Sequence, residues 1–179
     1  MRRFSARRSS SDAACAACRR RLSRSSGQSF STVAEADQLV VVDRRMEWDA
    51  TGYGGHSETA VESPSVDWYL AEGATHSGFE LFYLIQNPSA LSADVEVTYL
   101  LPSPLAPVVK TYTVASGSRM NVWVDREDPR LAAADVSAII HVTNGVPIIV
   151  ERSMYLSVAG QVFGAGHNSA GVTAPALHW

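Results

Sequence analysis

The chain is nearly free of cysteine. Cys15 and Cys18 are the only two among its 179 residues. A structural zinc site needs four ligands, and no second Cys-x2-Cys or His-x3-His motif supplies the other two. A thioredoxin-type pair needs a βαβ setting, but the surrounding segment is rich in Arg, Ser and Ala and has no periodicity. We therefore expect neither a zinc site nor a redox function from this pair.

Long apolar runs are also absent. No stretch reaches the roughly 18 residues that a transmembrane helix needs. The N-terminus reads MRRFSARR, like the charged opening of an export signal, but the polar stretch SSSDAACAACRRR follows where an apolar stretch should stand. The sequence therefore predicts no membrane span and no signal peptide.

Basic residues are scarce beyond the N-terminus. Eight of the fifteen Lys and Arg residues lie within residues 1–24, and the formal net charge is -3, so the rest of the chain is clearly acidic. Nucleic-acid binding needs clustered Lys or Arg to contact phosphates. We expect no nucleic-acid partner, and the biased composition of residues 1–28 predicts a disordered tail.

Catalytic motifs are missing as well. The sequence contains no Gly-x-Ser-x-Gly motif and no Cys–His arrangement typical of a nucleophilic enzyme. GAGH at residues 164–167 is not a phosphate-binding loop, because no Gly-Lys-Ser/Thr follows it. We therefore predict that the chain is not an enzyme and that it uses no cofactor and no catalytic metal.

What the chain does contain is an internal repeat. VDRRM at residues 42–46 aligns with VERSM at 150–154, an offset of 108. Gly-His at 55–56 aligns with Gly-His at 166–167, an offset of 111 that holds to the end of the chain, where Trp68 aligns with Trp179. Upstream, residues 29–41 can be laid on 137–149 without a gap. The repeat unit is therefore about 110 residues long.

The repeat divides the chain into parts. Residues 68–178 make one complete unit, and residues 29–67 are the C-terminal part of a truncated earlier unit. Trp179 is the first residue of a further unit. Residues 1–28 stand where the rest of the earlier unit should be, but they are too short and too polar to supply its strands.

The complete unit has β signals throughout. Residues 94–100 alternate cleanly, with Val95, Val97 and Tyr99 on one face. Asn144-Gly145 is a strong hairpin signal, and only residues 129–135 look helical. We predict an all-β fold, an antiparallel immunoglobulin-like β-sandwich of about seven strands, with a small open barrel as the alternative. The expected strands lie near residues 68–71, 79–86, 94–100, 108–114, 119–124, 136–142 and 148–156.

Five motifs carry a family resemblance: WYLAEG (68–73), LIQNPS (84–89), ASGSRMNVWV (115–124), VERSMY (150–155) and GAGH (164–167). Together they resemble a tandem repeat of secreted and surface proteins of bacteria, over residues 29–179. The resemblance implies immunoglobulin-like sandwiches strung in arrays, an extracellular or cell-surface location, and adjacent repeats as partners. The function of such repeats is mostly unassigned. The first copy departs from the pattern, since Glu47 stands where Tyr155 stands.

Arg44 and Arg152 are candidate structural residues, together with Trp68, which opens the unit. By strand alternation, Arg152 shares a face with apolar residues, and Arg44 does the same in the first copy. A buried unpaired charge is costly, so we expect an ion pair with an acidic residue. Glu72 of the AEG motif is the best candidate. The alternative is that the Arg side chain reaches solvent at the edge of the strand.

Two histidines recur at equivalent positions. His56 and His167 follow glycines in segments that we expect to be loops, and histidine is the commonest metal ligand. Neither segment offers further ligands at a suitable spacing, so we expect hydrogen bonds that close the loops. Glu72 and His76 have the spacing of an HExxH ligand pair, but that spacing aligns side chains only on a helix. We therefore predict no metal site.

Two other clusters have ordinary explanations. Residues 125–128, Asp-Arg-Glu-Asp, could offer oxygens to calcium, but they lack the EF-hand pattern and fit a solvated turn. Trp123, Tyr83 and Tyr112 could form a platform for sugars. In a sandwich, aromatic residues more often pack in the core or on the outer face.

Three functions remain. We favour a non-catalytic structural or adhesive repeat module of a bacterial extracellular or surface protein. The alternatives are a carbohydrate- or cell-wall-binding module, with extracellular polysaccharide as partner, and an accessory domain of a larger secreted enzyme. A fold of this type does not by itself decide among them.

Overall fold

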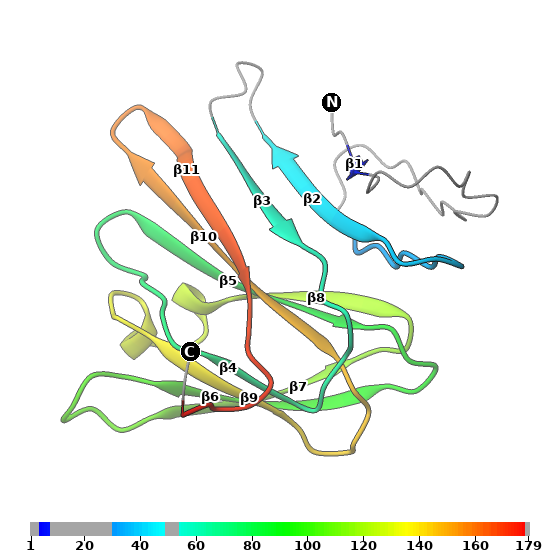
Figure 1. The fold of residues 1–179 in the computed structure, drawn as a ribbon. Helices are drawn as coiled ribbons and strands as arrows, with labels where there is room; N and C mark the ends of the chain where they lie inside the picture. Colours follow the sequence, from blue (N-terminus) through cyan, green and yellow to red (C-terminus); the bar gives the residue numbers. More distant parts are fainter. Residues whose placement is uncertain (1–3, 8–29, 49–53, 178–179) are drawn as a thin grey trace.

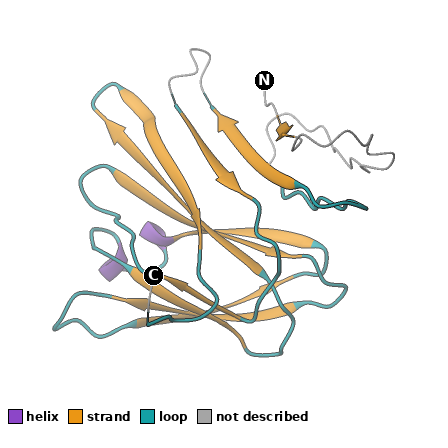
Figure 2. Ribbon diagram, viewed as in Figure 1, coloured by secondary structure: helices purple, strands orange, loops and turns teal. Residues whose placement is uncertain are grey.

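The computed structural model describes residues 4–7, 30–48 and 54–177, and strands dominate it (Figure 2). Two four-stranded antiparallel sheets pack face to face, and a third, smaller sheet lies beside them (Figure 1). The chain therefore folds as an all-β antiparallel sandwich, as the sequence predicts. No helix among these residues has the length and apolar character to cross a membrane.

The sandwich is formed by eight strands in two sheets. Sheet 1 has the order β11-β10-β5-β8, and its strands are Gln161–Ala170, Ile149–Val158, Phe79–Asn87 and Ser118–Trp123. Sheet 2 has the order β4-β9-β6-β7, and its strands are Asp67–Leu70, Ser137–Val142, Ala93–Leu100 and Val108–Val114. The third sheet has the order β1-β2-β3, with strands Phe4–Arg7, Val41–Glu47 and Gly55–Thr59.

The core lies between sheets 1 and 2. On β6 the predicted alternation places Val95, Val97 and Tyr99 in the interior, and the residues between them are exposed or half-buried. Each fully buried large apolar side chain contributes about 1.5–3 kcal/mol, so packing alone can hold a unit that has no cysteine. The largest fully buried side chains include Trp68, Tyr83, Tyr99, Leu81, Ile85, Leu131, Ile140 and Ile148.

The structure differs from the prediction in the number of strands and in which strands pair. Seven strands were expected in the unit and eight are present, because β11 was taken for a glycine-rich loop. The pairs β5–β8 and β6–β9 match the B–E and C–F pairs of an immunoglobulin domain. However, the first strand pairs with β9 and β10 pairs with β5, which is not the immunoglobulin order. The hairpin predicted across Asn144-Gly145 is wrong, because the chain passes there from β9 in sheet 2 to β10 in sheet 1.

The predicted helix at residues 129–135 is a single 3-10 turn, η2 (Pro129–Leu131), preceded by η1 (Val124–Arg126). The Asp128 side chain caps η2 by accepting a hydrogen bond from the Arg130 amide. The turn does not continue because Thr75 engages both the amide and the carbonyl of Ala134, which a longer helix would need for itself.

The β2–β3 hairpin copies the β10–β11 hairpin. Met46 pairs with His56, and Met154 pairs with His167, so the two hairpins share the register that the repeat offsets require. A Cβ atom on Gly55 would lie 3.0 Å from the Met46 carbonyl oxygen, and one on Gly166 would lie 3.0 Å from that of Met154. The sequence repeat is therefore also a structural repeat over these strands.

Upstream of the hairpin, the structure departs from the alignment. Residues 30–40 form no strand, although residues 29–41 were aligned with a segment that contains β9. Phe4–Arg7 form a strand that pairs antiparallel with β2, where a disordered tail was predicted. The rest of the predicted tail, residues 1–3 and 8–28, and Trp179 lie outside the described residues.

Candidate functional site

The β2–β3 hairpin lies against the outer face of sheet 1, and we call this contact the hairpin interface. On β10, Val150, Arg152 and Met154 point into the sandwich, so the alternate residues Glu151 and Tyr155 point outward. The hairpin contacts this outward face through Arg44, Trp48 and His56.

An ion pair anchors one end of the hairpin interface. Arg44 Nη2 lies 3.0 Å from Glu151 Oε2, and the two side chains are 31% and 19% exposed. Asn168 holds the same carboxylate by donating from Nδ2 to Glu151 Oε2 at 3.2 Å, and Ser153 Oγ donates to Asn168 Oδ1. Arg44 therefore has an acidic partner, as expected of it, but that partner comes from the neighbouring unit.

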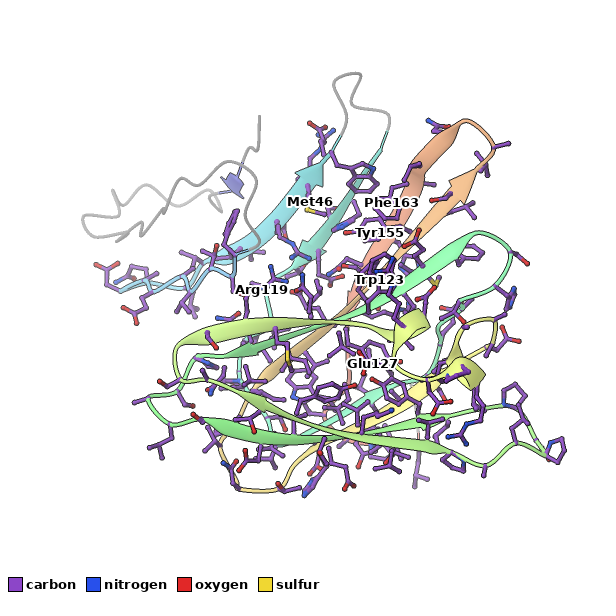
Figure 3. The ribbon with its side chains drawn as sticks, turned by 180° about the vertical axis from the view of Figure 1, so that it is seen from behind. Met46, Arg119, Trp123, Glu127, Tyr155 and Phe163 are labelled. Carbon is purple, nitrogen blue, oxygen red and sulfur yellow. The ribbon has the colours of Figure 1, made fainter. Side chains whose placement is uncertain are left out.

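An aromatic cluster forms the other end. The Trp48 and Tyr155 rings meet edge to face, with centroids 5.2 Å apart and planes at 87°, an arrangement favoured by the ring quadrupoles. Trp48 Nε1 donates to the Phe163 carbonyl oxygen at 2.6 Å. Tyr155 and Phe163, labelled in Figure 3, have centroids 4.9 Å apart. Two strands, β10 and β11, and the residue that follows β2 thus contribute to one cluster, which continues through Phe82 to Trp123.

His56 lies in the same cluster, with its ring centroid 5.5 Å from that of Trp48. Neither ring nitrogen has a hydrogen-bond partner, although both atoms are buried. Burial, with smaller contributions from the charges of Arg44 and His167, lowers the pKa of His56 to about 4. His56 is in β3 rather than in a loop, so the expected loop-closing hydrogen bond is wrong for this residue.

His167 is an exposed residue of β11. The segment was predicted to be a loop, but strand pairing with β10 runs through it. Burial and the charge of Arg152 lower the pKa of His167, while Glu72 opposes the shift. Among the described residues His167 makes no hydrogen bond through its ring, so it does not close a loop either.

Arg152 is a buried cation in the wall of the core, with a side chain 8% exposed. Its Nη1 donates to the Glu72 main-chain carbonyl oxygen and lies 3.4 Å from Glu72 Oε2. The Glu72 side chain is 73% exposed, so water screens the ionic part of the contact. The main-chain bond therefore contributes more than the ion pair, and it ties the AEG segment to β10.

Trp68 fixes the start of the complete unit. Its ring is 1% exposed, and Nε1 donates to the carbonyl oxygens of Ser65 at 3.2 Å and Ile148 at 3.1 Å. A buried indole N–H needs such partners. The residue thus joins the segment before β4 to the turn before β10, which is a structural role.

An open cleft of about 590 Å³ lies at the junction of the two copies. One wall is residues 58–63 of the first copy, and the other is residues 170–174 of the second, with Trp68 at the base. At the offset of 111, these two walls are equivalent segments. The cleft is therefore a product of the repeat, because the two chain segments that leave the hairpins run beside each other.

The other sequence candidates are structural in this fold. Glu72 contacts Arg152, whereas His76 Nε2 lies 2.9 Å from Asp135 Oδ1, so the two do not converge on one point. Within the residues that the structure describes, no group of three or more His, Cys, Asp or Glu side chains is arranged to hold a metal ion.

The acidic turn at 125–128 is used by the protein itself. Asp125 Oδ2 accepts a hydrogen bond from the Leu81 amide at 3.0 Å, and burial raises the pKa of Asp125. The Asp128 carboxylate receives two hydrogen bonds from the Arg130 guanidinium, and these hold the pKa of Asp128 at about 2. Both carboxylates therefore brace the turn.

The three aromatic residues proposed as a sugar platform lie in different places. Tyr83 is fully buried and stacks on Tyr99, with centroids 6.0 Å apart and planes at 13°. The Tyr112 hydroxyl donates to Glu127 Oε2 at 2.7 Å. Trp123 lies on the outer face of sheet 1, with the Arg126 guanidinium 3.4 Å from its ring centroid. They form no common platform.

Sequence reasoning missed the hairpin interface. Trp48, Glu151 and Tyr155 were not candidates, because nothing in the repeat showed what would cover the outer face of sheet 1. One signal was present: aromatic residues occupy outward positions on neighbouring strands, at Phe82 and Tyr155. Large aromatic residues in contact on an outward sheet face indicate that something packs there.

Comparison with known proteins agrees with the fold and adds no function. No family model matches the chain, and no curated protein matches it. A crystal structure of Thermotoga maritima 1070 is similar, with a TM-score of 0.55 and 14% sequence identity, over 63% of this chain and 97% of that one. The Anabaena sensory rhodopsin transducer matches with a TM-score of 0.41 and 25% identity, over 51% of this chain and 83% of that one. The first likeness supports the sandwich fold alone.

Proposed function

We propose that the chain is a non-catalytic structural module of a bacterial extracellular or surface protein, in which sandwiches of this type follow one another in tandem. The observation that carries the proposal is the hairpin interface. A hairpin with the register of β10–β11 belongs to one copy of the repeat, and it packs on the sheet of the next copy. The ion pair and the aromatic cluster then serve to join consecutive units.

The distribution of reactive groups supports this proposal over an enzyme. Several of the polar candidates that the sequence raised brace a turn, a strand or a junction. Arg152, Asp125 and Asp128 all contact groups of the protein itself. The location and the type of repeat rest on the motifs WYLAEG, VERSMY and GAGH, and remain part of the proposal.

The geometry of the aromatic cluster does not favour polysaccharide binding. Sugar rings stack on flat, exposed aromatic faces, but Phe82 and Trp123 are tilted by 38° to each other. Tyr155 meets Trp48 at 87° and Phe82 at 69°. When rings pack on one another in this way, neighbouring side chains cover their faces.

The test uses the full chain and two assays. We expect no retention on insoluble bacterial cell-wall polysaccharide, and an unchanged melting temperature when soluble polysaccharide is added. Antibody labelling of intact cells that produce the parent protein should detect the module outside the membrane. Retention that is lost in a Trp123→Ala variant, or detection only after cell lysis, would contradict the proposal.

A further inference from the structure

We propose that the place of β10–β11 in the sandwich is an acceptor site for the β2–β3 hairpin of the same chain. In a tandem array, each unit could then take its last two strands from the unit before it. The inference rests on the repeat organisation within the proposed function. It concerns only how neighbouring units join.

The two hairpins present the same inward face. Val42, Arg44 and Met46 correspond to Val150, Arg152 and Met154 at an offset of 108. The strand pairing within each hairpin is also the same, because Arg44 pairs with Glu58 and Arg152 pairs with Ser169, at the offset of 111 on the second strand. If β2 took the place of β10 beside β5, the side chains that enter the core would be of the same types.

In its present position, the β2–β3 hairpin packs this face against the outer surface of sheet 1. Arg44 and Met46, whose counterparts Arg152 and Met154 are buried in the sandwich, are only half-buried here. Both ring nitrogens of His56 are buried without a hydrogen-bond partner, whereas its counterpart His167 is exposed on β11. Buried polar atoms are rarely left in this state. In its present position, the hairpin therefore leaves buried polar atoms without hydrogen bonds.

The acceptor site offers Arg44 a second set of partners in place of Glu151. There Arg152 donates to the Glu72 carbonyl oxygen and lies beside the Glu72 carboxylate. An arginine in the same register would reach the same groups. The AEG segment to which Glu72 belongs has no counterpart in the truncated first copy, so Glu72 of the complete unit is the partner available to Arg44.

The connection to β4 permits the exchange. Val172, which follows β11, now forms an antiparallel bridge with Tyr69 of β4. Val61 is its equivalent at the offset of 111. If Val61 took this bridge, residues 62–66 would remain to turn the chain back into β4 at Asp67, a length within the range of ordinary connections.

In the isolated chain, the resident hairpin β10–β11 occupies the acceptor site most of the time. Tyr155 contacts Phe82 at a centroid distance of 5.8 Å, whereas Glu47 would take that place after exchange. The exchanged arrangement is therefore a minor population in equilibrium with the resident one.

Disulfide trapping in the full chain tests the proposal. In a Cys15→Ser, Cys18→Ser background, Leu84→Cys is combined with Asp43→Cys. Glu151 lies opposite Leu84 in the resident arrangement, so its equivalent Asp43 would lie opposite Leu84 only after exchange. Under copper phenanthroline oxidation we expect an intrachain disulfide, identified by peptide mass spectrometry, that forms at least about tenfold faster than in an off-register control.

The controls share the same Leu84→Cys substitution. Leu84→Cys with Glu151→Cys reports the resident hairpin and should be trapped rapidly, which shows that this position can form a disulfide in the folded chain. Leu84→Cys with Arg45→Cys is the off-register control, since diagonal neighbours are about 7–8 Å apart and a disulfide needs closer Cα atoms. Trapping of Asp43→Cys no faster than this control, or only between chains at high concentration, overturns the proposal.

Hydrogen exchange of the unsubstituted chain gives a second readout. The exchange of hairpins requires β10–β11 to leave the site while β6 and β9 stay paired. Amides of β10 should therefore exchange at least about tenfold faster than those of β6 and β9. Equal protection of the three strands would overturn the proposal without bearing on cell-surface location or polysaccharide binding.

Discussion

At the scale of single residues, the repeated arginine shows how one residue type meets two environments. Arg152 is enclosed by core residues and donates to a main-chain carbonyl, and the Glu72 carboxylate beside it stays in water. Arg44 is not enclosed by core residues in this way, and it contacts the carboxylate of Glu151 instead. In both places the cation is held by an oxygen, because a guanidinium without a partner is costly to bury.

The relative importance of the two Glu72 groups can be measured. Arg152→Ala should lower the free energy of unfolding by about 1–3 kcal/mol, because it removes a buried hydrogen bond and its packing. Glu72→Ala should cost less than about 1 kcal/mol, because its carboxylate is exposed and the main-chain acceptor remains. Urea denaturation monitored by tryptophan fluorescence measures both. Equal losses in the two variants would assign the contact to the carboxylate instead.

His56 predicts a pH dependence. Its pKa is lowered to about 4 in the folded chain from about 6.5 in an unfolded chain, so below pH 6.5 the unfolded state binds more protons. The His56 contribution to stability is therefore unaffected above about pH 6.5 and declines as the pH falls from there toward 4. Melting temperatures of wild type and His56→Gln between pH 4 and 8 should diverge in this window, with the variant losing less.

The groups around His56 define the control. Arg44 and His167 both disfavour its protonated form, and His167 itself has a lowered pKa. A His167→Gln variant should therefore retain most of the wild-type pH dependence, since the His167 side chain is exposed. Parallel curves for wild type and His56→Gln would contradict the assigned role of burial.

At the scale of elements, the β2–β3 hairpin is held by contacts with another unit. An isolated two-stranded hairpin is marginally stable in water, so its order depends on sheet 1. The contacts are concentrated at the Trp48–Tyr155 pair and the Arg44–Glu151 pair. Residues 60–66 connect the hairpin to β4, and residues 60–63 line the junction cleft.

Trp48→Ala should release the hairpin and leave the sandwich folded. The variant loses an aromatic pair and the hydrogen bond to the Phe163 carbonyl. We expect protease cleavage between residues 54 and 66 to accelerate at least about tenfold, while a fragment that contains residues 67–170 persists. Arg45→Ala is the matched control, because its side chain is 70% exposed and forms its ion pair with Glu47 on the same strand. Loss of both parts together would show that the hairpin and the sandwich unfold as one unit.

At the scale of the whole molecule, sequence periodicity predicted the antiparallel sandwich but missed its last strand, β11. Alternation on β6 predicted that strand correctly, because a buried face imposes a period of two. The Asn144-Gly145 signal marked a turn but predicted the wrong pairing, because the flanking strands β9 and β10 lie in different sheets. β11 was missed because its glycines and small polar residues hide the pattern. Its pairing is imposed by β10 rather than by its own side chains.

The candidate site was predictable only within one unit. Arg152 and Glu72 were paired from alternation and from the AEG motif, and the structure places them together. The hairpin interface joins two copies, and a single sequence carries no direct signal of which outward face meets which hairpin. Outward aromatic residues such as Phe82 and Tyr155 mark a covered face but do not identify what covers it.

The central claim is that the hairpin of one copy is energetically coupled to the sheet of the next. A double-mutant cycle of Trp48→Ala and Tyr155→Ala in the full chain measures this coupling directly. The free energy of hairpin opening is obtained from hydrogen exchange of β2 and β3 amides. We predict a coupling energy of about 0.5–1.5 kcal/mol, as for an edge-to-face aromatic pair. Additive effects within about 0.3 kcal/mol would contradict the claim that the two units meet at this interface.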